Sequence, residues 1–559
     1  MRLPPGRDSE PLNRRLWLLL LRRGSIALIV VLVASISGGA WWLRNFILQD
    51  LVPLVQTNLA ELLGRPIEIG KVDSVTLNSI RFSSLNIPAT AQDSDRVTAK
   101  AIDVQFNPLQ VLFTRTLNLN VALVEPSVYL EQDKNGQWLT TQIKTGKEEK
   151  GFITTNLESL IIRNASLALV PTPKPGIPKT TVVFNQANGV IRILPEKQGA
   201  TTITNLSYDI GASVSNTQGK VDIDGKTQLV SGQINSTNLN VQARDLLVAD
   251  ITKLVQSPIS ATSGSVNAFL TVDITPKAPI SVTGTADLNK IAAKVDNIPQ
   301  LITNTQGNLQ FQGQNISTNN LTTNFGKIPL QVQGAVNTQT GYNLNALILP
   351  TNIQTILSTL NAKSPVTAIG QVQANVKIQG NIKQPTATGT ISTVKLATID
   401  RLQLNSVSSN FRVDISGTPV ITLSNLQVTP TLGGQILGSG KIQLAQNGNV
   451  NLNIQALGIP GNSVAGIYNV ALPLNIGNVA ANANISGQLG QPLQLALQNL
   501  KVAPEIGGVV TANGNIQLAQ QGNVNLNIQA SGIPGNRVAS AYNIALPINI
   551  GNVGANGNV

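Results

Sequence analysis

The sequence predicts a mainly β protein that is built from repeats and follows an N-terminal transmembrane helix. The nine residues GNVNLNIQA occur at 448–456 and again at 522–530. Within each copy Val, Leu and Ile alternate with Asn and Gln, and a two-residue period is typical of a strand with one apolar and one polar face. Ahead of the first expected strands, residues 25–43 form a run of 19 residues without a charge.

The uncharged run is expected to cross a membrane as a signal anchor. At about 1.5 Å per residue it spans roughly 28 Å, close to the thickness of the hydrocarbon core. Arg22 and Arg23 precede the run, and Trp41 and Trp42 lie at its far end, where interfacial aromatic residues are common. The positive-inside rule places the basic tail, residues 1–24, in the cytoplasm. The alternative is a cleaved signal peptide with a small-residue site near Ser37–Ala40.

Composition excludes several kinds of chemistry. The 559 residues include no cysteine and no histidine, which rules out disulfides, thiolate nucleophiles, Cys/His zinc sites and histidine general bases. The net charge is +12, but a third of this excess lies in residues 1–24, and no basic stripe with interleaved aromatic residues is present. We therefore expect no nucleic-acid partner.

No motif marks a catalytic, metal or cofactor site. Glu148 with Glu149, and Asp93 with Asp95, are the nearest approach to paired carboxylates, and solvated loops explain them better than cation binding. Gly433–Gly440 lacks the lysine of a phosphate-binding loop and is expected to be a turn between strands. We predict a protein that is not an enzyme.

A repeat larger than the two near-identical copies can be traced. A short helical stretch, a proline and a glycine before a strand recur four times, with the glycines spaced by 106, 107 and 74 positions. The last spacing corresponds to a unit that has lost about one hairpin, 33 residues. The helical stretches are Leu246–Val255, Ile353–Leu360, Val464–Val470 and Val538–Ile544, and the glycines are Gly264, Gly370, Gly477 and Gly551.

These features divide the chain into an N-terminal block and tandem repeats. The block is expected at 44–150, the start of the β-repeat region at 151–245, and the tandem repeats at 246–559. The repeat units lie near 246–352, 353–463 and 464–537, followed by a truncated unit at 538–559.

One-sided strands need a cover for their apolar face, and the sequence has too few amphipathic helices to supply it. A sandwich, a closed solenoid and an open curved sheet all remain possible. We expect the open curved sheet, elongated and with a few short helices, because the units show neither a constant period of 20–30 residues nor long linkers. The candidate lining residues are Val372, Ala374, Val376, Ile378, Val450, Leu452, Ile454, Val524, Leu526 and Ile528.

An open apolar surface of this size requires an apolar occupant. Lipid meets the requirement, because drawing two acyl chains of about 16 carbons into water costs on the order of 25 kcal/mol at roughly 0.8 kcal/mol per CH₂. A continuous apolar trough removes most of that barrier without a chemical step.

Several segments resemble one known family. Residues 63–70, LGRPIEIG, look like the segment that follows the anchor in TamB and AsmA-like proteins. This chain also resembles the same proteins in a succession of four segments, at residues 102–109, 117–123, 125–130 and 133–138. The sequences YLEQD and GQW in this region are most similar to those of the cyanobacterial branch. The resemblance covers about residues 44–138 and is architectural beyond them.

The resemblance implies an inner-membrane protein with a single span, a cytoplasmic N-terminus and a periplasmic β-taco groove. It implies phospholipid as cargo between membranes and a role in outer-membrane protein assembly and secretion beside an Omp85-type partner. Members of the family are usually longer and end in a C-terminal domain, which a chain that stops at Val559 inside a repeat is expected to lack. That leaves docking to the partner open. The alternative is a purely structural or adhesive β-repeat surface protein.

Overall fold

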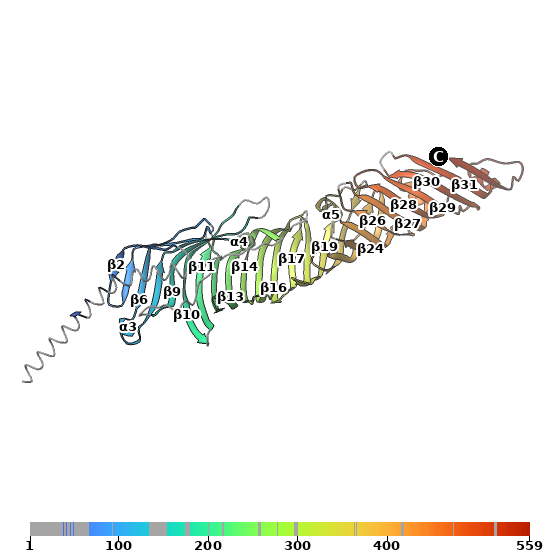
Figure 1. Ribbon diagram of the computed structural model, residues 1–559. Helices are drawn as coiled ribbons and strands as arrows, with labels where there is room; N and C mark the ends of the chain where they lie inside the picture. The colour runs from blue at the N-terminus through green and yellow to red at the C-terminus, as the bar shows by residue number, and fades with distance from the viewer. Residues whose placement is uncertain are drawn as a thin grey trace, which may run out of the picture. The chain divides into compact units, whose positions relative to one another are not determined.

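The computed structural model describes residues 66–558, apart from short gaps, together with the single positions 37, 38, 41, 45 and 49. The gaps fall at 92, 133–153, 174–178, 199–200, 215–216, 255–258, 277, 296–299, 363, 365, 415–418, 446, 473 and 519–521. The chain divides into unit 1, Met1–Leu239, and unit 2, Asn240–Val559. Both are mainly β, as predicted (Figure 1).

Unit 1 contains short strands followed by long ones. The short strands are β1 (Glu68–Ile69), β2 (Val72–Val75), β3 (Ser79–Phe82), β4 (Leu85–Ile87), β5 (Arg96–Ala99), β6 (Ala101–Phe106), β7 (Thr116–Val124) and β8 (Ser127–Glu131), with helix α3 (Pro108–Thr114) between β6 and β7. The long strands are β9 (Thr154–Val170), β10 (Val182–Gln198), β11 (Thr201–Val214) and β12 (Lys220–Val230), and β13 (Gln233–Leu247) spans the division between the units.

The short strands of unit 1 are the two arms of a sheet that is folded along a crease. β9 pairs in parallel with β7 along its first half and with β8 along its second half. One arm then continues as β7–β6–β3–β2 and the other as β8–β5–β4–β1, all antiparallel. Backbone hydrogen bonds bridge the crease itself, for example from Gly70 N–H to Ser84 O at 2.9 Å.

The two arms pack their apolar faces against each other. Ile80, Phe82 and Leu117 are at most 1 % exposed, and they belong to one cluster with Leu85 and Ala99 of the other arm. Alternation on both arms supplies this core, because every second side chain of each strand points to the same face. The interior of this part of unit 1 is therefore filled by protein side chains.

Unit 2 is an antiparallel meander. Its long strands are β14 (Ile259–Ile274), β15 (Ser281–Val295), β16 (Ile302–Gly313), β17 (Asn315–Phe325), β18 (Ile328–Asn337), β19 (Gly341–Asn352), β21 (Gln371–Gly380), β22 (Thr386–Thr393), β24 (Leu402–Asp414), β25 (Val420–Pro430), β26 (Gln435–Gln443), β27 (Asn449–Pro460), β28 (Asn478–Gln488), β29 (Leu493–Val502), β30 (Val509–Leu518), β31 (Val524–Pro534) and β32 (Asn552–Asn558). Two short strands, β20 (Ala368–Ile369) and β23 (Ala397–Ile399), pair with each other. Among the described residues of unit 2, the first strand of this meander, β14, and the last, β32, do not pair with each other, so this sheet is open.

The four predicted helical stretches are present as α4 (Val248–Leu254), α5 (Ile353–Thr359), α6 (Gly461–Ile467) and α7 (Gly535–Ala541). Six long strands separate α4 from α5 and six separate α5 from α6, but only four separate α6 from α7. The loss of one hairpin from the last full repeat is thus confirmed. Even numbers of antiparallel strands return the chain to the same edge of the sheet, where Figure 1 shows α4 and α5.

The chain is held at this edge by a repeated contact. The amide of Asn462 donates to Leu474 O and accepts from Ile476 N–H, and Asn536 does the same with Ile548 O and Ile550 N–H. The two loops between helix and strand are therefore fastened in the same way in both repeats. Glycine begins both α6 and α7, where a Cβ on Gly461 would come within 2.5 Å of the Ile476 side chain and one on Gly535 within 2.4 Å of the Ile550 side chain.

One sequence expectation is wrong in part. The turn expected over Gly433–Gly440 is confined to the residues before Gln435, and β26 begins there. Gly438 and Gly440 lie inside that strand, facing Ile454 and Leu452 of β27. The glycines of this segment predicted a turn. At Gly438 and Gly440, however, the absence of a side chain makes room for the backbone and side chains of β27.

The packed core of unit 1 can be tested by paired leucine substitutions. Leu117→Ala, at a fully buried position, should lower the free energy of unfolding by about 3 kcal/mol, because it removes buried methyl groups and leaves a cavity. Leu194→Ala, at a position that is 63 % exposed, should change it by less than about 0.5 kcal/mol. Chemical denaturation followed by circular dichroism measures both. Equal losses would contradict the assignment of the core.

Candidate functional site

The ten predicted lining residues all lie on one face of unit 2, on strands β21, β27 and β31. Val372, Ala374 and Val450 are buried, and most of the others are partly exposed. Val524 is the most accessible, at 47 % exposed. The residues that alternate with them on β21, from Gln371 to Gln379, are exposed without exception. The strands therefore have the two chemically different faces that the sequence predicts.

Strand register joins these residues into one continuous line, which we name the central apolar row. Thirteen residues pair in succession across thirteen strands, from β17 to β31. They are Leu321, Val332, Ala346, Val376, Gly389, Phe411, Leu423, Gly440, Leu452, Ile485, Leu495, Ile516 and Val524. Twelve inter-strand steps of about 4.8 Å give the row a length on the order of 60 Å.

The row brings together residues that are far apart in the sequence. Val376, Leu452 and Val524, one from each candidate strand, all belong to it. Ile378 and Val450 share the next row, through Ala387, Val413, Ile421 and Ile442. Ile454 reaches Leu526 through Ala483, Leu497 and Gly514. Val372 and Ala374 on β21 and Ile528 on β31 lie on the same face but outside these three rows.

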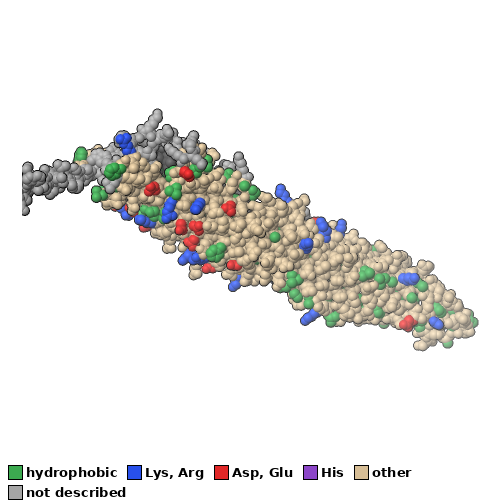
Figure 2. Space-filling model, turned by 90° about the horizontal axis from the view of Figure 1, so that it is seen from below, with side chains coloured by type: hydrophobic (Ala, Val, Ile, Leu, Met, Phe, Trp, Pro, Cys, Tyr) green, Lys and Arg blue, Asp and Glu red, His purple; other side chains and the backbone are tan. Residues whose placement is uncertain are grey.

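The charges of these strands lie on the opposite face. On the opposite face, the residues one position away from the central apolar row form a row of their own. This row includes Lys377, Arg412 and Lys441, and every other member is Asn, Gln, Ser or Thr. Figure 2 shows a surface that is mostly neutral and polar, with hydrophobic side chains scattered singly. A charge on the apolar face would be desolvated without a partner, at a cost of several kcal/mol. The central apolar row carries none.

Sequence reasoning missed the bulges that bend these strands. The register shifts between Thr318 and Leu321 in β17, between Leu423 and Leu426 in β25, and between Leu497 and Leu500 in β29. Each shift contains an Asn-Leu pair, and the φ of Asn425 is 52°. Because a bulge inserts an extra residue and bends its strand, the recurring Asn-Leu pair was the available signal.

Of the acidic residues weighed as possible cation ligands, Asp95 has a structural role. Asp95 is 4 % exposed, so the expected solvated loop is wrong for this residue. Its Oδ1 accepts the N–H of Glu131 at 2.8 Å, which joins the loop to β8. Within the part of the chain that the structure describes, His, Cys, Asp and Glu form no group that could hold a metal ion. Glu148 and Glu149 lie outside that part.

Polar side chains around Glu131, which we name the polar clasp, hold the end of β8 against neighbouring segments. Glu131 accepts hydrogen bonds from Ser94 and Tyr129 and pairs with Lys179 at 2.7 Å, while the Arg96 guanidinium lies 3.9 Å from the centre of the Tyr129 ring. The bond to Lys179 holds the pKa of Glu131 below its usual value of 4.5 and the pKa of Lys179 above 10.5. Elsewhere, burial raises the pKa of Tyr468 to about 12, with help from Asp400.

Several expectations fall on positions before residue 66. Arg22, Arg23, Trp42 and most of the expected anchor lie outside the described residues, while Trp41 is 66 % exposed. Among the residues that the structure describes, no helix combines the length and the apolar character needed to cross a membrane. No model of a known protein family matches the chain, and no curated protein was found to be similar to it.

The clasp predicts a pH dependence. Because the pKa of Glu131 is lowered on folding, its pairing stabilises the end of β8 above about pH 4.5 and is lost as the pH falls through the lower folded value. The hydrogen-exchange protection of the Gln132 amide, which donates to Val170 O, should then fall by no more than about fivefold, since the pair is partly exposed.

Glu131→Gln should remove this fall, and Glu158→Gln, elsewhere in unit 1, should leave it in place. Protection that falls equally in the wild type and Glu131→Gln would show that another group titrates.

Proposed function

We propose that this chain is a TamB- or AsmA-like protein that carries phospholipid along the apolar face of unit 2. The observation that carries the proposal is the central apolar row, which runs without a charge through thirteen strands while its larger members stay partly exposed. A protein core of the same residues would be filled, as the cluster in unit 1 is. An exposed apolar surface of this extent is normally covered by a ligand, a partner or lipid.

Acyl chains fit this surface better than a compact ligand does. The row consists of aliphatic residues, one phenylalanine and two glycines, so it offers dispersion contacts and no hydrogen-bond donor or acceptor from its side chains. Such a surface cannot fix one orientation of a ligand, but it can hold a methylene chain equally well at successive strands. A row on the order of 60 Å is longer than one lipid, which suits movement along it.

The remaining parts of the proposal come from the resemblance of residues 44–138. They are an inner-membrane anchor at 25–43, a periplasmic location for the strands, a role in outer-membrane protein assembly and secretion, and an Omp85-type partner. In this proposal the anchor fixes one end of the sheet at the membrane that supplies lipid.

Site-specific crosslinking tests the proposal. A photoreactive amino acid at Leu452, in the central apolar row, should capture phospholipid when the full chain is expressed in membranes, and mass spectrometry identifies the adduct. The same amino acid at Gln455, on the opposite face of β27, is the matched control and should capture none. Equal yields at the two positions would contradict a lipid-lined face.

A charge tests transport itself. Leu452→Glu should reduce transfer of a fluorescent phospholipid between vesicles by at least about tenfold, because a carboxylate in the row must be desolvated as an acyl chain passes. Gln455→Glu should leave transfer unchanged, and circular dichroism should show both variants folded. If Leu452→Glu unfolds the protein, the face is a closed core, as the structural or adhesive alternative requires.

A further inference from the structure

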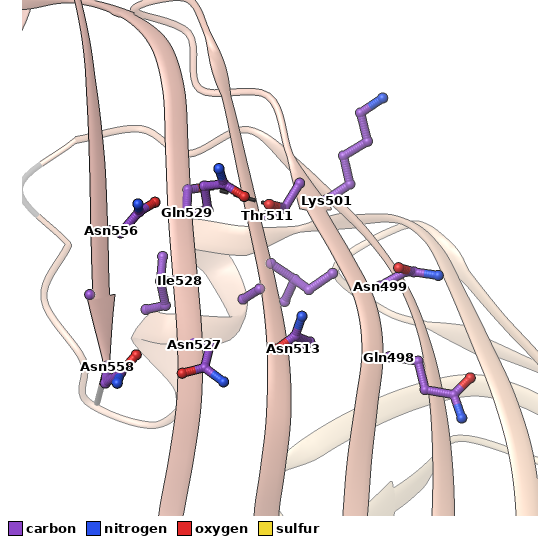
Figure 3. A pocket seen from close by; sticks show the side chains of 13 residues that line it. Gln498, Asn499, Lys501, Thr511, Asn513, Asn527, Ile528, Gln529, Asn556 and Asn558 are labelled. Atoms are coloured by element: carbon purple, nitrogen blue, oxygen red, sulfur yellow. Dashed lines mark hydrogen bonds between the residues drawn. The ribbon is translucent and has the colours of Figure 1, made fainter.

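The polar face of unit 2 carries two hollows with the same chemistry. The first, which we name hollow A, has a volume of about 570 Å³ and crosses β17, β18, β19, β21 and β22. The second, hollow B, has a volume of about 580 Å³ and crosses β29, β30, β31 and β32 (Figure 3). Both are bounded by residues on either side of an apolar position, such as Asn527 and Gln529 around Ile528. Since neighbours in a strand point to opposite faces, the walls belong to the polar face.

The two hollows occupy equivalent places in the repeat. Each begins at a bulge with an Asn-Leu pair, at Asn320 in hollow A and at Asn499 in hollow B. Each then crosses the two strands that precede a short helix, α5 or α7, and the strand that follows it. The hollow therefore recurs with the repeat and follows from the arrangement of strands that the two repeats share.

Amide side chains in the hollows have no protein partner. Among the residues that the structure describes, Asn345 and Asn375 in hollow A, and Asn513, Asn527 and Asn556 in hollow B, make no side-chain hydrogen bond. Some amides elsewhere on unit 2 do pair with one another, as Asn337 does with Asn315 at 2.7 Å. Unpaired amides that face a common hollow can donate and accept toward a ligand.

The middle repeat shows the paired alternative. Asn484 occupies the position in β28 that corresponds to Lys377 in β21 and to Asn558 in β32. Its amide donates to Asn451 Oδ1 at 2.8 Å and to Asn453 Oδ1 at 2.9 Å, which ties the two strands together across this face. The amides of hollows A and B lack such a tie.

We propose that hollows A and B bind a neutral polyhydroxylated chain, a glycan. Hydroxyl groups both donate and accept, as amides do, and the lining contains no carboxylate and one ammonium group per hollow, from Lys377 or Lys501. An anionic polymer would need more cations than this. Two equivalent hollows favour a ligand that repeats, since a polymer that reaches both gains from multivalency. This inference is independent of lipid transport, which uses the opposite face.

The test uses the full chain and two soluble probes, the hexamer of N-acetylglucosamine and cellohexaose, with binding measured by titration calorimetry. Asn513 and Asn527 pair directly across β30 and β31, so Asn513→Leu with Asn527→Leu removes the facing amides of hollow B at nearly constant volume. We expect affinity for the bound probe to fall by about tenfold at that hollow.

Asn515→Leu with Asn525→Leu is the matched control, because these residues pair across the same strands one step outside the hollow. This variant should bind as the wild type does. No binding of either hexamer to the wild type, or equal losses in the two double variants, would overturn the proposal. Lipid transfer that persists in Asn513→Leu with Asn527→Leu separates the glycan site from the lipid face.

Discussion

The rest of this structure depends on the alternation of aliphatic and neutral polar residues that most of its strands share. Because the side-chain period of a strand is two, a slip of one residue would place Asn and Gln on the apolar face and Val, Leu and Ile on the other. The register from Leu321 to Val524 is therefore fixed by the difference between the two faces. Neighbouring strands satisfy the backbone, and the apolar face is left without a protein cover.

The same alternation has two outcomes in the two units. In the first eight strands of unit 1, which are short and form two arms, Phe82 and Leu85 on adjacent arms meet and close a core. In unit 2 bulges bend the strands, and most of the larger side chains of the central apolar row stay partly exposed. Residue type alone does not separate these outcomes, since Val, Leu and Ile line both.

This explains which features the sequence could predict. Local patterns predict the two faces of β27 and β31 and the four short helices, and the structure contains them. Local patterns also predict that the last full repeat is one hairpin shorter, and four strands instead of six lie between α6 and α7. The crease of unit 1 depends on parallel pairing of β7 and β8 with β9, across residues 133–153, and no local pattern encodes it. Asp95 was misplaced for the same reason, because its partner, Glu131, lies 36 residues away. Three members of the central apolar row, Val376, Leu452 and Val524, were predicted as lining residues, but its other ten members and its continuity required the register.

The polar face has a constraint of its own. A row made of charges would repel itself along the sheet, whereas Asn and Gln can pair with one another, as Asn484 does with Asn451 and Asn453. The position that Asn484 occupies is Lys377 in one neighbouring repeat and Asn558 in the other, and neither of these bridges the strands. Since Asn558 is the same residue type as Asn484, the residue at this position does not by itself decide whether the adjacent amides pair. A change on the polar face leaves the side chains of the central apolar row untouched, so the two faces of one strand can acquire separate functions.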